Sequence, residues 1–155
     1  MALSSKLLLG FFIIISTVGA GLFGSLSLNQ NPNQNYQEII LDDSYFQTAP
    51  RDPYTITFLE INGDLLTIKV SYGGGNCDHE FILIGSGIFM ESYPVQTTIV
   101  LSHNANGDLA EKLIREHFIF DLSPLIEAYQ RLYLEISAEI VLHFEGVEEP
   151  LTYRF

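Results

Sequence analysis

A thiol and two imidazoles are the side chains of this 155-residue chain best suited to chemistry. Cys77 and His79 lie one residue apart after a run of three glycines (73–75), and His103 ends a later apolar stretch. Thiolate sulfur and imidazole nitrogen are ligands that zinc and copper share. One hypothesis is therefore a zinc or copper site made by Cys77, His79 and His103, with no certain fourth ligand.

Strand alternation is what would bring these side chains together. In a strand that begins near Cys77, every second residue points to the same face, so Cys77, His79 and Phe81 share a face. His103 shares the core-facing parity of its own stretch (95–103). Asp108 could add an oxygen ligand. The alternative needs no metal: a buried apolar cysteine, and histidines hydrogen-bonded to backbone at strand ends.

Other motifs favour ordinary turns over binding sites. The three glycines neither open a helix nor precede the Lys and Ser/Thr of a phosphate-binding loop, so they predict a turn or bulge that lets another segment approach closely. The segment 104–108 lacks the spacing of a calcium loop and predicts a tight turn. With no nucleophile and orienting base at a recognisable spacing, we expect no catalytic residues and no enzyme.

The rest of the chain is typical of β-strands. Two β-branched and aromatic runs (54–61 and 64–72) flank Asn62-Gly63, which predicts a hairpin. Similar runs at 79–84, 95–103, 112–120, 136–144 and 150–155 are separated by turn residues, and only 123–134 resembles a helix, with Pro124 near its start. About seven strands and one short crossover helix predict an all-β fold, an immunoglobulin-like antiparallel β-sandwich.

The N-terminus predicts export. Lys6 precedes an uncharged apolar run (7–23), and Val18-Gly19-Ala20 offers a cleavage site for signal peptidase. The run also approaches the length of a membrane span, so a single uncleaved anchor is the alternative. We expect a signal peptide or anchor at 1–24, a polar flexible linker at 25–52 and one β-sandwich domain at 53–155. The protein would then be secreted or anchored to the outer face of the cytoplasmic membrane.

The net negative charge of the chain limits the kinds of molecule that it is expected to bind. The 19 Asp and Glu outnumber the 7 Lys and Arg, and such an acidic surface disfavours nucleic acid. The expected partner is an envelope protein or a glycan. A single cysteine excludes an internal disulfide.

Three segments carry a resemblance: Gly74-Gly-Asn-Cys-Asp-His-Glu-Phe81, Leu101-Ser-His-Asn-Ala-Asn-Gly-Asp108 and Phe120-Asp-Leu-Ser-Pro-Leu125. Together they resemble small uncharacterised bacterial exported or lipoprotein domains of β-sandwich type. The resemblance implies a cell-envelope location and no known activity. The chain departs from the lipoproteins because no cysteine follows its apolar run. The leading hypothesis is thus a noncatalytic binding or structural module of the cell envelope, and the alternative is the metal protein.

Overall fold

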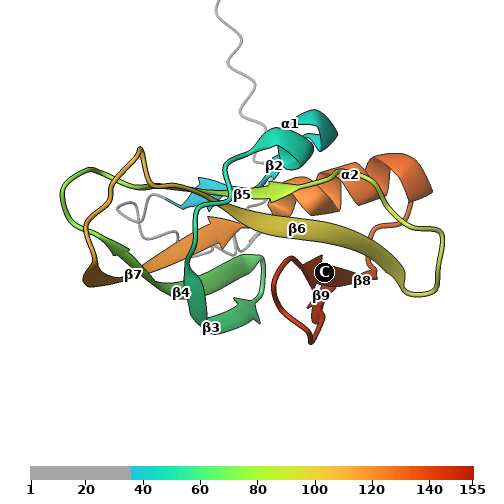
Figure 1. The fold of residues 1–155 in the computed structure, drawn as a ribbon. Coiled ribbons are helices and arrows are strands. Elements are labelled where there is room, and N and C mark those ends of the chain that lie inside the picture. Colours follow the sequence, from blue (N-terminus) through green and yellow to red (C-terminus); the bar gives the residue numbers. More distant parts are fainter. Residues whose placement is uncertain (1–35) are drawn as a thin grey trace, which may run out of the picture. The chain divides into compact units, whose positions relative to one another are not determined.

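The computed structural model describes residues 36–155, which fold into two β-sheets and two helices (Figure 1). The expected signal or anchor segment, 1–24, lies outside the described residues. None of the helices in the described part of the chain is long and apolar enough to cross a membrane. The described residues, 36–155, belong to one compact unit, which includes part of the expected linker before residue 53.

The first sheet has four strands in the order β1-β7-β4-β3. They are β1 (Gln37–Glu38), β7 (Lys112–Asp121), β4 (Leu65–Gly74) and β3 (Thr55–Asn62). The predicted hairpin is confirmed, because β3 and β4 pair antiparallel around Gly63, whose φ of 58° suits a residue without a Cβ. This sheet supplies a core face from alternate β4 residues, as period-two patterning requires.

The second sheet has five strands in the order β2-β5-β6-β8-β9. They are β2 (Ile40–Leu41), β5 (Glu80–Gly85), β6 (Val95–Asn104), β8 (Glu139–Phe144) and β9 (Leu151–Arg154). Alternate β8 residues, Ile140, Leu142 and Phe144, are buried. The core between the two sheets is formed by fully buried side chains from both, among them Leu66, Ile68, Leu83, Leu101, Phe120 and Tyr153.

Two helices complete the fold. Helix α1 (Asp43–Thr48) begins after Asp42, whose carboxylate accepts the Tyr45 N–H at 2.8 Å, and it packs on the outer face of β5 and β6. Helix α2 (Ser123–Tyr133) has Pro124 in its first turn and buries Leu125 and Tyr129, as expected for a crossover helix.

Three features correct the expected fold. The sheets are mixed rather than antiparallel, because β1–β7, β2–β5 and β6–β8 pair in parallel. After β6 the chain crosses to the first sheet as β7 and returns through α2, which brings β8 in beside β6 in the same direction. The described part has nine strands and two helices instead of about seven and one, and the extra elements lie in the expected linker. An all-β fold of two sheets is confirmed, and immunoglobulin-like kinship stays a prediction.

Candidate functional site

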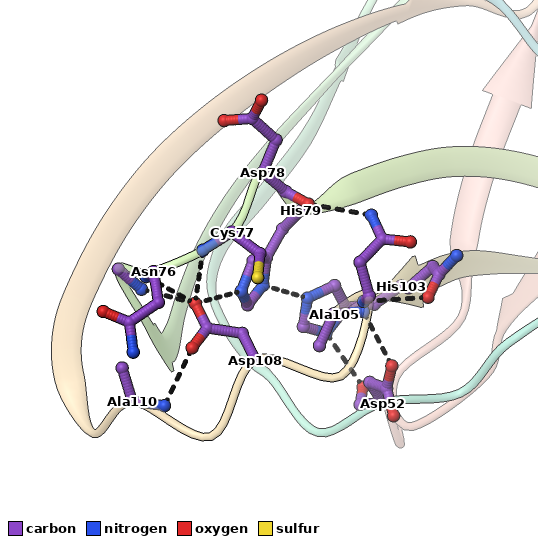
Figure 2. A network of polar contacts seen from close by, with 12 residues as sticks. Asp52, Asn76, Cys77, Asp78, His79, His103, Ala105, Asp108 and Ala110 are labelled. Atoms are coloured by element: carbon purple, nitrogen blue, oxygen red, sulfur yellow. Dashed lines mark hydrogen bonds and ion pairs between the residues drawn. The ribbon is translucent and has the colours of Figure 1, made fainter.

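The pairing of β5 with β6 brings the two predicted histidines together. Phe81 lies opposite His103 in the antiparallel register, and His79 comes two residues before Phe81. The Nδ1 atom of His79 lies 2.8 Å from Nε2 of His103 (Figure 2). The convergence predicted from strand alternation is therefore confirmed for both imidazoles.

Cys77 occupies a different environment from the one predicted. Strand β5 begins at Glu80, so Cys77 lies three residues before the strand, in a loop where the alternation no longer holds. The Cys77 side chain is exposed, and the contact that this residue makes with the site is its backbone N–H.

Asp108 is the centre of the site. Its Oδ2 atom accepts the N–H groups of Gly75, Asn76 and Cys77 at 2.8, 2.8 and 3.0 Å, and its Oδ1 accepts the Ala110 N–H at 2.8 Å. These backbone donors, Ala110 first, hold the pKa of the carboxyl far below its ordinary 3.8, because they stabilise the ionised form. The Asp108 side chain is fully buried, and its Oδ2 lies 3.4 Å from His79 Nε2.

The predicted tight turn supports Asp108. The Asp108 N–H donates to the Ala105 carbonyl at 2.9 Å, and Gly107 has a φ of 74°. Asn106 donates from Nδ2 to the Asp78 carbonyl at 2.8 Å, which joins this turn to the loop before β5. The carboxylate is thus used within the protein, as the turn interpretation requires.

Gly74 makes room for the histidine. A Cβ at this position would lie 2.6 Å from His79 Nε2 and 2.8 Å from its Cε1, distances that real Cβ atoms do not show. The close approach predicted for the glycine run is therefore confirmed at Gly74. Gly75, with a φ of 130°, provides the change of direction that follows.

His103 is enclosed by backbone and rings. Its Nδ1 lies 3.1 Å from the Asp52 carbonyl oxygen, and its ring stacks on Phe81 with centroids 4.2 Å apart. Burial lowers the pKa of His103 from its ordinary 6.5, because the charged form loses hydration. The part played by Asp52 was missed in the sequence, since it reaches the site from the segment before β3 and no local motif marks it.

The ring nitrogens of both histidines are engaged within the protein. Two ring nitrogens face each other at hydrogen-bond distance, and the other two face Asp108 and the Asp52 carbonyl. Within residues 36–155, no group of three or more His, Cys, Asp or Glu side chains is arranged to hold an ion. A base or a ligand needs a free lone pair, and these rings have all four nitrogens engaged. The arrangement can hold the 75–77 loop and the segment at Asp52 in place, and it can hold a proton between the two rings.

At the other end of β5 and β6, apolar side chains meet solvent. The loop between these strands packs Phe89 against Tyr129 and Tyr133 of α2. Its other large side chains remain exposed, and so do those at the end of α2. We call this set the α2-end surface: Ile88, Met90, Tyr93, Leu132, Leu134 and Ile136.

The fold places the chain in the class of small all-β proteins with two packed sheets. The sequence matches no described protein family and no curated protein. Among solved structures, it is similar to a NigD-like immunity protein from Bacteroides caccae, with a TM-score of 0.57 and 13% identity over 77% of this chain and 63% of that one. At such identity the likeness concerns the fold.

Two further structures show weaker likeness. One is a protein of unknown function from Bacteroides vulgatus, with a TM-score of 0.47 and 17% identity over 77% of this chain and 56% of that one. The other is provisionally described as a lipoprotein, from Bacteroides fragilis, with a TM-score of 0.49 and 9% identity over 77% and 68% of the two chains. The chain spans less than two thirds of the length of the B. caccae and B. vulgatus proteins. The expected resemblance to small bacterial proteins is confirmed as a weak structural one.

Proposed function

We propose that the protein is an exported, noncatalytic module that binds another protein of the cell envelope through the α2-end surface. The observation that carries the proposal is the exposure of large apolar side chains on the β5–β6 loop, at the end of α2 and in the segment that follows it. Leu134 and Ile136 are 87% and 88% exposed, although burying such a side chain is worth about 1.5–3 kcal/mol. Exposed apolar groups that gather in one patch are typical of interaction sites.

Several contacts hold these residues in one region. Phe89 fixes the β5–β6 loop on α2, and Tyr93 lines a cleft together with Tyr129 and the segment 135–139. Gln130 donates from Nε2 to the Ile136 carbonyl at 3.3 Å, which ties that segment to α2. The exposed groups are therefore presented by an anchored surface, and aliphatic chains of this kind suit a protein partner better than a glycan.

The backbone at Leu134 adds to the proposal. Leu134 ends α2 with a φ of 58°, a left-handed conformation that usually belongs to glycine at this position. A bulky residue there costs about 1–2 kcal/mol in local strain. An exposed leucine under strain is better explained by a binding role than by stability, since a glycine would serve the helix end better.

Two further observations agree with this function. The apolar run 7–23 after Lys6 is typical of export. The B. caccae protein with the similar fold is described as an immunity protein, and noncatalytic binding agrees with that description. The histidine site fits a noncatalytic protein as well, because its ring nitrogens are spent on internal hydrogen bonds.

Site-specific photo-crosslinking in the native envelope tests the proposal. A photoreactive residue at 136 should give one adduct of defined mass, identified by mass spectrometry. The same residue at 109 is the control, because Leu109 is 92% exposed but lies in the loop before β7. Equal adducts at both positions, or an adduct that contains a second copy of this chain, would contradict the proposal. The mass of the mature protein tests export, with loss of residues 1–20 expected.

The competing hypothesis is the zinc or copper protein that uses Cys77, His79 and His103. It requires the two rings to break their mutual hydrogen bond and the exposed thiol to turn toward them. Metal analysis of untagged protein decides between the two. Stoichiometric zinc or copper that is lost in both Cys77→Ser and His103→Ala would support the metal protein.

A further inference from the structure

A line of three polar contacts crosses the interior between the two histidines and their neighbours. Asp108 Oδ2 lies 3.4 Å from His79 Nε2, His79 Nδ1 lies 2.8 Å from His103 Nε2, and His103 Nδ1 lies 3.1 Å from the Asp52 carbonyl oxygen (Figure 2). The line ends at two hydrogen-bond acceptors, the Asp108 carboxylate oxygen and the Asp52 carbonyl oxygen. Each of the three gaps therefore needs one ring proton.

The number of protons decides the charge. Two neutral imidazoles carry one N–H each, which fills two of the three gaps. The carboxylate has no proton to give, since its oxygens already accept four backbone N–H groups. We propose that His79 and His103 together hold three ring protons, so that the pair carries one positive charge and acts as a proton-dependent clasp on the surrounding loops.

The charge belongs on His79. Its side chain is only 1% exposed, and its Nε2 faces the Asp108 carboxylate. The Tyr72 ring lies against it at a centroid distance of 4.6 Å, and an aromatic face attracts a cation. His103 stays neutral with its proton on Nδ1, because its neighbours are the Asp52 carbonyl and the Phe81 ring. Burial lowers the pKa of His103, which agrees with this assignment.

Other charged groups lie around the pair. Asp52, in the segment before β3, acts on His103 itself: burial lowers the pKa of His103, and the Asp52 charge is a smaller influence that raises it, while Asp52 Oδ2 accepts the Ala105 N–H at 2.7 Å. Glu116 of β7 interacts with Tyr72, and the Lys112 stem packs beside Gly75. Among the described residues, the carboxylate group in contact with a ring nitrogen of His79 or His103 is that of Asp108.

The clasp connects pieces that are distant in sequence. Asp108 holds the 75–77 loop by three N–H groups, His79 follows that loop, and His103 reaches the segment at Asp52. Loss of the third proton would place a lone pair against the carboxylate or would leave one gap without a bond. Raising the pH until the pair loses this proton should therefore loosen the 75–77 loop.

Histidine NMR spectra of the ¹⁵N-labelled protein, treated with a chelator, test the assignment between about pH 5 and about pH 9. His117 is exposed on β7 and serves as the internal reference. At neutral pH we expect protons on both nitrogens of His79 and on Nδ1 alone of His103. When His79 releases its proton, amide exchange at Gly75, Asn76 and Cys77 should speed up at least tenfold.

Substitutions sharpen the test. Asp108→Asn removes the anion, so at neutral pH the pair should hold two ring protons instead of three. Asp78→Asn is the matched control and should change nothing, because Asp78 is exposed and takes part through its backbone carbonyl. If both rings of the wild type are neutral once His117 is neutral, the proposal is wrong. Unchanged amide exchange on proton release would overturn the clasp. The wild-type titration decides even if the Asp108 variant fails to fold.

Discussion

The two ends of the β5–β6 pair use their side chains in opposite ways. At one end, groups that usually do chemistry, two imidazoles and a carboxylate, are buried and bonded to each other and to backbone. At the other end, leucine and isoleucine, which usually fill cores, are exposed. The comparison teaches that residue type alone does not tell where a group lies in this protein: the imidazoles and the carboxylate are bonded within it, and large apolar side chains face solvent.

The largest effect should come from removing the buried carboxylate. Asp108→Ala leaves four backbone N–H groups and His79 without their acceptor, and buried donors without acceptors are costly. We expect the urea midpoint, followed by circular dichroism, to fall further than for any other substitution proposed here. Asp78→Ala is the control. A shift no larger than that of the control would show that this end of the β5–β6 pair does not stabilise the fold.

Low pH should destabilise the protein through the same end of the β5–β6 pair, where Asp108 and His103 lie. The pKa of Asp108 is lowered by its backbone donors, so its contribution is complete above the ordinary 3.8 and is lost as the pH falls toward the native value. The pKa of His103 is lowered by burial, so below about 6.5 the unfolded chain binds a proton that the native site refuses. Both groups therefore lower the free energy of unfolding as the pH decreases. Urea midpoints measured across this range should decline steadily, and less steeply in Asp108→Asn.

Crowding the histidine should cost less than removing its partner. Gly74→Ala places a Cβ against His79, and overpacking of this kind costs about 1–3 kcal/mol in the free energy of unfolding. Gly73→Ala is the matched control, because its Cβ would meet its nearest atom at 3.4 Å. Equal urea midpoints for the two variants would mean that the ring moves aside freely.

The smallest effect should appear at the apolar end, with the opposite sign. Leu134→Gly relieves a left-handed leucine and should stabilise the protein by about 1 kcal/mol. The same variant should lower the crosslinking yield from position 136, since it removes part of the α2-end surface. Lower stability, or an undiminished yield, would remove Leu134 from the binding role.

Much of the fold could be predicted because its signals are local. The seven expected strands and the helix at 123–133 form close to the predicted bounds, since alternation and turn residues act over a few positions. The parallel pairing of β6 with β8 was missed, because it depends on a crossing between sheets that no single segment records. The polar composition of the segment before residue 53 favoured a flexible linker, whereas Ile39 within it is buried.

The site was predicted in part for the same reason. Strand parity predicted that His79, next to the start of β5, meets His103, but it fails at Cys77, three residues before the strand, which is exposed and not on the core side. Asp108 was considered as a metal ligand, whereas its oxygens accept backbone N–H groups. Asp52 depends on a contact across 51 positions of sequence, which only the folded chain reveals.

The start of the folded unit has a mechanical consequence. Strand β1 pairs with β7 in one sheet, strand β2 pairs with β5 in the other, and Ile39 between them is buried in the core. A pull applied through residue 36 is therefore divided between both sheets as shear along parallel strands. Residues 37–41 therefore couple the two sheets mechanically, and the domain should resist such a force without one sheet separating from the other.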